Sequence, residues 1–257
     1  MTEHVAVTQE DGGILLVRLT RPEKKNALTG AMYEAMTDAL ASADSDPGIG
    51  AVVLTGSGGV FTAGNDLGDF LAVAEDGGAD LPASRFIRQL ARTETPLVAA
   101  VEGLAIGVGT TLTFHCDLVY AAPGTLFRMP FVDLGLVPEA GSSHLLPRRI
   151  GIAKATEFLM LGDGYDAHEA FRLGLVNEVV EKQSLLAYSL DQARRLAAKP
   201  RGAIAATRRL IRGDGAELTA AMERESRAFR EALASPEARR AFEAFLTKSG
   251  TAKPDKR

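Results

Sequence analysis

Two short apolar runs, each followed by a run of small residues, constrain the fold of this chain more than any other feature. The apolar runs are AVVL at 51–54 and LVAAV at 97–101, lengths typical of buried strands. The segments that follow them are FTAGNDL at 61–67 and GLAIGVG at 103–109. Small residues at strand ends expose backbone N–H groups, and two facing loops of this kind would hold a carbonyl oxygen that becomes negative. The sequence therefore predicts an α/β fold with an oxyanion site made of main-chain groups.

The rest of the chain alternates between strand and helix patterns in the same way. We expect strands near 5–8, 13–19 and 118–121, and a helix that Thr29 caps and that ends before Asp46. After Gly151 the pattern becomes helical, with one more strand at 175–180. The stretch 201–248 is charged and helical in period, so we expect a core at 1–200 and a separate helical lobe at 201–257.

The composition argues against several classes of protein. With 257 residues and 46% hydrophobic content the chain can bury a substantial core. The net charge is −4 and no long basic run occurs, so we expect no nucleic-acid partner. Cys116 is the single cysteine, which excludes an internal disulfide and favours the cytoplasm. We expect no membrane insertion, because no apolar run approaches spanning length, and no metal, because the histidines lack ligand spacing.

Nucleotide-binding explanations of the glycine runs are weaker. The run at 107–109 begins like a dinucleotide fingerprint, but Leu112 stands at the third glycine position. The run GSGG at 56–59 lacks the Gly-Lys-Ser/Thr that completes a phosphate loop. Either run alone could equally serve a tight turn. Their pairing favours a functional site.

Four segments together resemble the signatures of one family. They are TRPEKKNAL at 20–28, FTAGNDL at 61–67, EGLAIGVGTTL at 102–112 followed by Cys116 and Asp117, and GLVPEAGSS at 135–143. In order and spacing they resemble the crotonase superfamily of enoyl-CoA hydratases and isomerases. The resemblance implies a crotonase-type spiral of ββα units with a C-terminal helical trimerisation lobe. It also implies a homotrimer or a hexamer of two trimers, and an acyl-CoA thioester of fatty-acid metabolism as substrate, with no cofactor beyond the coenzyme A of that substrate.

The resemblance assigns main-chain and side-chain roles. The backbone N–H groups of Ala63 and Val108 match the two oxyanion donors of the family, with Val108 where glycine is usual. Hydratases carry two glutamates at positions that read Thr111 and Phe131 here, so neither can act as a carboxylate base. Glu139 matches the catalytic glutamate of the Δ3,Δ2-enoyl-CoA isomerases.

One carboxylate suits an isomerase. Glu139 would remove a proton from C2 of a 3-enoyl thioester and return it at C4, in an apolar pocket that raises its basicity. A purely structural alternative is that Glu139 caps the helix that begins near Ser142. At the level of function, an enoyl-CoA hydratase or acyl-CoA hydrolase and a non-catalytic acyl-CoA-binding protein remain alternatives.

Further residues are expected around the substrate. By resemblance, the adenine and pyrophosphate end of coenzyme A lies near Lys24, Lys25, Ala27 and Leu28, with Phe245 and Lys248 of a neighbouring lobe completing that site. Residues 67–92 should cover the acyl pocket. The remaining positions expected to line or shape the site are Gly64, Asn65, Asp66, Leu67, Gly107 and Phe131.

Overall fold

The main sheet has six strands and is largely parallel. The structure is a computed structural model that describes residues 3–68, 81–213 and 215–251, and the side chains up to residue 244 within these ranges. The strand order is β1–β2–β3–β4–β6–β9. Their bounds are Val5–Glu10, Ile14–Leu19, Ala51–Thr55, Leu97–Val101, Leu118–Ala121 and Glu178–Val179. Only β1 and β2 pair antiparallel; the other neighbours are parallel.

Two of these strands are buried along their whole length. Every residue of β3 and of β4 is buried, as expected for parallel strands covered on both faces. The strand predicted at 175–180 shrinks to the two residues of β9. The N–H groups of Leu175 and Val176 instead donate to Ala170 O in α6 (Ala167–Arg172). These two residues therefore bond to the preceding helix and not to a neighbouring strand.

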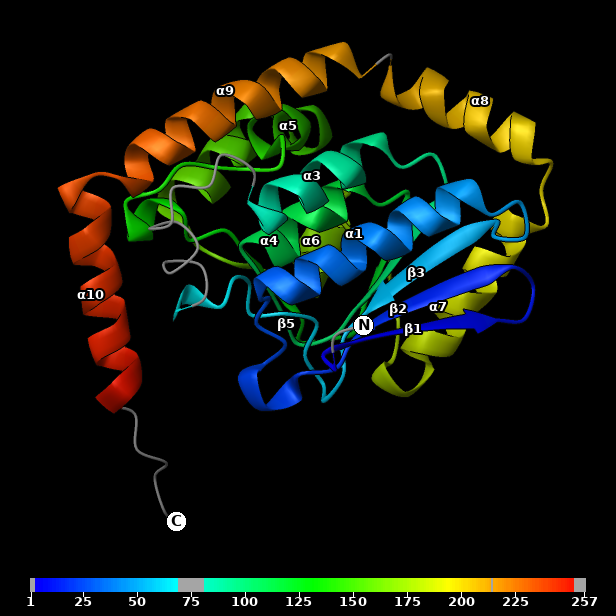
Figure 1. The fold of residues 1–257 in the computed structure, drawn as a ribbon, viewed down its shortest axis with the longest axis horizontal. Helices are drawn as coiled ribbons and strands as arrows, with labels where there is room; N and C mark the ends of the chain where they lie inside the picture. The colour runs from blue at the N-terminus through cyan, green and yellow to red at the C-terminus, as the bar shows by residue number, and fades with distance from the viewer. Residues whose placement is uncertain (1–2, 69–80, 214, 252–257) are drawn as a thin grey trace.

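A second, smaller sheet runs beside the first. It contains β5 (Leu104–Ile106), β7 (Leu126–Arg128) and β8 (Tyr165–Asp166) in that order. Along the chain β4 is followed by β5 and β6 by β7, so successive turns of the chain add a strand to each sheet. This is the spiral of repeated units that the resemblance implies (Figure 1).

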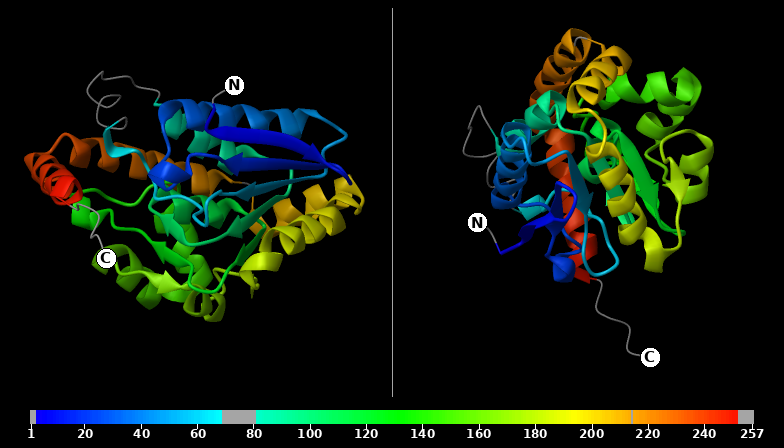
Figure 2. Two further views of the ribbon diagram at one scale, coloured as in Figure 1. Left: turned by 90° about the horizontal axis from the view of Figure 1, so that it is seen from below. Right: turned by 90° about the vertical axis from the view of Figure 1, so that its right-hand side faces the viewer.

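Helices cover both faces of the main sheet. On one face α1 (Gly30–Ser45) and α3 (Pro82–Arg92) pack with Val52, Leu54, Ala99 and Val101. On the other, α7 (Lys182–Ala197) packs with Val53, Val98 and Ala100. The two views of Figure 2 show α1 in blue and α7 in yellow on opposite sides of the sheet. The predicted cap of α1 is confirmed, because the Thr29 hydroxyl accepts a hydrogen bond from the Met32 N–H at 3.4 Å.

Three C-terminal helices pass over the edge of this core. They are α8 (Arg201–Arg212), α9 (Ala216–Leu233) and α10 (Pro236–Thr251). In Figure 1, α9 passes over α5 (Ser142–Leu161), α8 lies at the upper right, and α10 descends on the left from the end of α9. The division into two domains at residue 200 stays a prediction. In the described ranges, the structure contains no helix with both the length and the apolar character to cross a bilayer.

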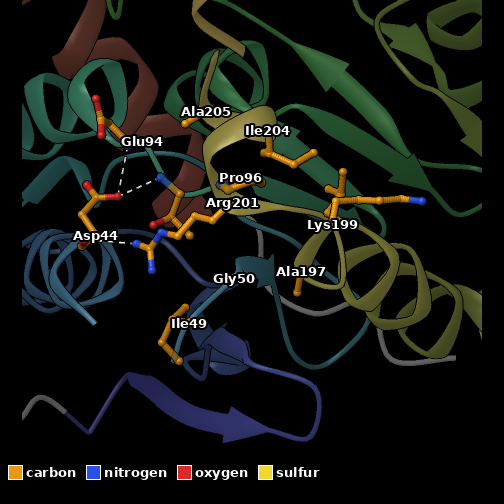
Figure 3. A pocket seen from close by; sticks show the side chains of 12 residues that line it. Asp44, Ile49, Gly50, Glu94, Pro96, Ala197, Lys199, Arg201, Ile204 and Ala205 are labelled. Atoms are coloured by element: carbon orange, nitrogen blue, oxygen red, sulfur yellow. Dashed lines mark hydrogen bonds between the residues drawn. The ribbon is translucent and has the colours of Figure 1, made fainter. Parts of the chain in front are cut away.

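A small hollow marks where α8 meets the core (Figure 3). Its volume is about 60 Å³, and its walls come from α1, α7, α8 and the residues just before β3 and β4. Asp44 accepts hydrogen bonds from the Glu94 and Thr95 N–H groups at 3.0 and 2.8 Å. Arg201 donates to the main-chain oxygens of Asp44 and Asp46 at 3.3 and 3.1 Å. The two bonds from Arg201 fix the first turn of α8 to the core.

Candidate active site

The two small-residue loops lie side by side, as the sequence predicts. The Thr62 N–H donates to Leu104 O at 2.8 Å, and the Ile106 N–H donates to Thr62 O at 3.1 Å. A Cβ atom on Gly64 would lie 2.8 Å from Ile106 O. A Cβ atom on Gly109 would lie 2.5 Å from the Thr62 side chain. Glycine at these two positions therefore allows the loops to approach each other.

Asn65, and not Ala63, presents an unpaired main-chain N–H in the first loop. The Ala63 N–H donates to Lys25 O at 2.9 Å, so the prediction that Ala63 is an oxyanion donor is wrong. Gly64, with φ of +89°, redirects the chain at this point. On either side of Asn65, Gly64 O accepts from the Leu28 N–H and the Asp66 N–H donates to Leu28 O. The Asn65 N–H therefore points away from the Leu28 segment. Among the described residues that N–H has no acceptor.

The second loop presents the N–H of Val108. Gly107 adopts a positive φ of 56° and donates its own N–H to Arg128 O at 2.8 Å. Val108 is the first residue of α4 (Val108–Thr111), and no described residue accepts its N–H. Val108 and Asn65 line the same cavity, so that cavity contains two unpaired main-chain donors.

Glu139 lines this cavity as well. The residue keeps some accessible surface, while protein atoms surround its carboxyl group. The pKa of Glu139 is raised to about 8, mainly by burial; a hydrogen bond opposes this rise, and the nearby Glu225 charge adds to it. That bond runs from the Thr111 hydroxyl to Glu139 Oε1 at 2.5 Å. A carboxylate in these surroundings is a much stronger base than an exposed one.

A buried histidine supports the turn that carries Glu139. Ala140 has a left-handed φ of +57°, which a non-glycine residue adopts only when its surroundings hold it. The His115 ring contacts Ala140 O through Nε2 at 2.7 Å. Burial lowers the pKa of His115 to about 4, so the ring is neutral at physiological pH and its Nε2–H donates to this oxygen.

Glu225 of α9 performs the capping role considered for Glu139. Its carboxylate accepts hydrogen bonds from the Gly141 N–H at 2.6 Å and from the Ser143 N–H and hydroxyl at 2.8 and 2.5 Å. These groups form the start of α5. Glu139 contributes only its main-chain oxygen there, which accepts from Ser142. The Glu139 side chain is thereby left for the cavity.

Glu225 is absent from the predicted site residues, although the sequence contains a signal for it. Leu218, Met222 and Phe229 lie on one face of α9, at helical spacing. Glu225 falls on the same stripe and is 7% exposed. A carboxylate within an apolar stripe indicates a buried polar contact.

The cavity is large and has two kinds of wall. Its volume is about 1100 Å³. Apolar side chains from α3 and α9 line part of it: Ile87, Ala91, Leu218, Met222, Phe229 and Leu233. Arginines line another part, on α3, α8 and α9: Arg88, Arg92, Arg208, Arg209, Arg212, Arg227 and Arg230. The apolar wall can cover a hydrocarbon chain and exclude water.

The other predicted positions near the first loop are not among the residues that line the cavity. Lys24 and Lys25 are exposed, at and just after the short helix η1 (Pro22–Lys24). The Asp66 carboxylate pairs with Arg21 at 2.8 Å, so it joins the first loop to the segment before η1. Arg21 also donates to Ala27 O at 3.0 Å.

The remaining predictions fall in the core or outside the described side chains. Phe131 is buried, and Leu67 packs against the same cluster. Phe245 and Lys248 belong to α10, but their side chains lie outside the described part, as do residues 69–80 of the predicted pocket cover. Within the described ranges, no three His, Cys, Asp or Glu side chains lie close enough together to hold a metal ion.

Comparisons with known proteins identify relatives of this chain. The sequence pattern of the family Enoyl-CoA hydratase/isomerase matches residues 9–253. Probable enoyl-CoA hydratase echA8 of Mycobacterium bovis is 34% identical over 251 residues, 96% of this chain and 97% of that protein. Enoyl-CoA delta isomerase 2 of Rattus norvegicus is 35% identical over 252 residues, 95% of this chain and 63% of the rat protein.

A solved structure agrees as well. The enoyl-CoA hydratase/isomerase from Pseudoalteromonas atlantica T6c superposes with a TM-score of 0.90 at 42% identity, covering 96% of this chain and 98% of that one. Fold, sequence pattern and site geometry thus lead to one conclusion: the chain belongs to the enoyl-CoA hydratase/isomerase family of the crotonase superfamily.

Proposed function

We propose that this protein is a Δ3,Δ2-enoyl-CoA isomerase. The proposal rests on one observation, that the buried Glu139 carboxyl lines the same cavity as the unpaired N–H groups of Asn65 and Val108. A base beside two preorganised donors suits removal of a proton next to a thioester carbonyl. At the two positions where hydratases carry glutamates, Thr111 and Phe131 supply no carboxylate.

In the proposed reaction one carboxylate moves one proton. Ionised Glu139 takes the proton from C2 of a 3-enoyl thioester, and the electron pair of the broken bond moves toward the carbonyl. Its oxygen becomes negative and accepts hydrogen bonds from the Asn65 and Val108 N–H groups. The pair then returns to form the C2=C3 bond, while the C3=C4 pair takes the proton from Glu139 at C4. Atoms and charge balance without water or a redox partner.

The apolar wall supports this choice of reaction. Leu218, Met222 and Phe229 of α9 line the cavity that holds Glu139. Such a wall excludes water from the dienolate and keeps the abstracted proton on the carboxyl group. Hydration of a 2-enoyl-CoA with a water activated by Glu139 is the second candidate, favoured by the hydratase name of the Mycobacterium bovis relative.

The test is product analysis with a medium-chain 3-enoyl-CoA. We expect a product of unchanged mass with the ultraviolet absorption of a conjugated thioester. A product one water heavier from a 2-enoyl-CoA would indicate a hydratase, and free coenzyme A would indicate a hydrolase. Bound but unchanged acyl-CoA would indicate a binding protein.

Substitution of the base provides the matched experiment. Glu139→Gln should lower kcat by about 10²–10⁴-fold, the usual contribution of a general base, while acyl-CoA binding persists. Glu223→Gln is the control, because Glu223 is an exposed glutamate that lines the same cavity from α9. Retained isomerase activity in Glu139→Gln would contradict the proposal.

A further inference from the structure

We propose that the C-terminal helices clamp the turn that carries Glu139, with Glu225 as a positioning residue for that base. The inference rests on the proposed role of Glu139. It adds that the base is correctly placed only when α9 and α10 are docked on the core.

The turn has little regular structure of its own. It connects η3 (Val132–Leu134) to α5, and three of its residues have left-handed backbones: Gly135 at φ +66°, Ala140 at +57° and Gly141 at +72°. A left-handed non-glycine residue is strained and persists only where its surroundings determine it. The position of Glu139 therefore depends on contacts from outside the turn.

At the end next to α5, the outside contacts come from α9. Glu225 accepts three hydrogen bonds there, from the main chain of Gly141 and from the main chain and hydroxyl of Ser143. A Cβ atom on Gly141 would lie 2.4 Å from Leu218 Cδ1 and 3.3 Å from Met222 Cγ. Both polar and apolar side chains of α9 therefore contact the residues just after Glu139.

At the other end the contact comes from α10. A Cβ atom on Gly135 would lie 2.9 Å from the Ala238 N atom and 3.0 Å from its Cα. Ala238 is completely buried in the core cluster. The turn is thus held by α9 after Glu139 and by α10 before it, while His115 and Thr111 hold it from the core side.

Glu225 also acts on Glu139 through its charge. In the described part of the chain Glu225 has no ion-pair partner, and its hydrogen bonds come from neutral groups at the start of α5. Burial raises the pKa of Glu225, whereas these hydrogen bonds and the charge of Arg224 oppose that rise and favour the ionised form. Among the described residues, Glu225 is the one charged group that shifts the pKa of Glu139, and it raises that pKa. An ionised neighbour makes Glu139 hold its proton more tightly.

The test compares two substitutions on the same helix. Glu225→Gln removes the charge and leaves one acceptor oxygen for three donors, whereas Glu231→Gln changes an exposed glutamate of α9. We expect Glu225→Gln to lower kcat for a 3-enoyl-CoA by about 10- to 100-fold, the scale of a small misplacement of a catalytic group, with little change in KM. The acidic limb of the pH–rate profile should move to lower pH. Glu231→Gln should change neither kcat nor the position of the acidic limb.

A titration keeps this inference separate from the proposed function. Carboxyl ¹³C NMR of the full-length protein, with the Glu139 signal assigned by its loss in Glu139→Gln, measures the pKa of Glu139 without turnover. A lower pKa in Glu225→Gln supports the clamp even if the wild-type protein isomerises nothing. An unchanged pKa, together with an unchanged kcat per folded molecule, would overturn it even if isomerase activity is found.

A second variant guards against misfolding of the first. Leu218→Ala keeps the Glu225 charge and removes the apolar contact on Gly141. We expect a lower kcat because the position of Glu139 changes. The acidic limb of the pH–rate profile should stay in place because the charge of Glu225 is kept. Leu218→Ala with full kcat would contradict the clamp.

Discussion

At the scale of single residues, Glu139 illustrates a conflict between function and stability. Its ordinary pKa is 4.5 and its pKa in the fold is about 8. Below pH 4.5 the carboxyl is protonated whether the chain is folded or not, so the shift has no effect there. Between pH 4.5 and about 8 the unfolded chain loses this proton and the folded one keeps it, so stability falls as pH rises.

Glu139→Gln should therefore stabilise the fold. Each pKa unit corresponds to about 1.4 kcal/mol, so the gain amounts to a few kcal/mol at pH 8 and is small at pH 5. Glutamine retains an oxygen to accept the Thr111 hydroxyl. Thermal denaturation at both pH values measures the effect, with Glu223→Gln as the control. An equal change in Tm at pH 5 and pH 8 would contradict the linkage.

Thr111 tunes the same group in the opposite direction. Its hydroxyl donates to Glu139 and lowers the pKa of that carboxyl. Thr111→Val keeps the shape and removes the donor, so the acidic limb of the pH–rate profile should move to higher pH. Thr113→Val is a suitable control, since that hydroxyl bonds to Thr110 O at 2.6 Å. In Thr113→Val the acidic limb should not move. If it does not move in Thr111→Val either, the Thr111 hydroxyl does not lower the pKa of Glu139.

At the scale of elements, a feature can be predicted from the sequence when the residues that determine it are close together in the chain. The runs at 51–54 and 97–101 predicted β3 and β4 because buried parallel strands are continuously apolar. The direction of the Asn65 N–H was missed because it depends on the turn at Gly64 and on pairing with a distant segment at Leu28. The bonds from Glu225 to the start of α5 join segments far apart in sequence, which local patterns do not reveal.

Asp117 joins several elements and gives a prediction at this scale. It accepts hydrogen bonds from the Leu97 N–H at 2.8 Å, Arg208 Nε at 2.8 Å and Arg212 Nη2 at 2.7 Å. The Arg208 side chain is 10% exposed. Removing one partner from a buried ion pair leaves a charge uncompensated.

Asp117→Asn should therefore destabilise the fold by about 3 kcal/mol or more, measured by urea denaturation. The control is Asp133→Asn. Asp133 pairs with Arg128 at 2.8 Å, but the two side chains are 50% and 42% exposed. We expect a loss below about 1 kcal/mol for that exposed pair. Equal losses in the two variants would show that the Asp117 cluster adds no particular stability.

At the scale of the whole molecule, α8 presents an apolar surface. Leu210 is 85% exposed and Ile211 79% exposed. Two neighbouring exposed aliphatic side chains suit a contact between subunits. With the resemblance to a family of trimers and hexamers, we expect a trimer or a hexamer of the 27.2 kDa chain.

Light scattering coupled to gel filtration measures this assembly. The wild-type mass should be three or six times that of the chain, and Leu210→Glu combined with Ile211→Glu should lower it. The exposed Glu231→Gln should leave the mass unchanged. A wild-type mass of one chain would contradict the prediction.

The main-chain origin of the two proposed oxyanion donors has a consequence for how this enzyme can diverge. The peptide N–H groups of Asn65 and Val108 persist whatever side chain is encoded at codons 65 and 108, unless that side chain is proline. Both side chains line the cavity. Point mutations at these codons can therefore alter which acyl groups fit without deleting the N–H groups proposed to stabilise the anion, so that specificity can drift within a lineage while the chemistry is inherited unchanged.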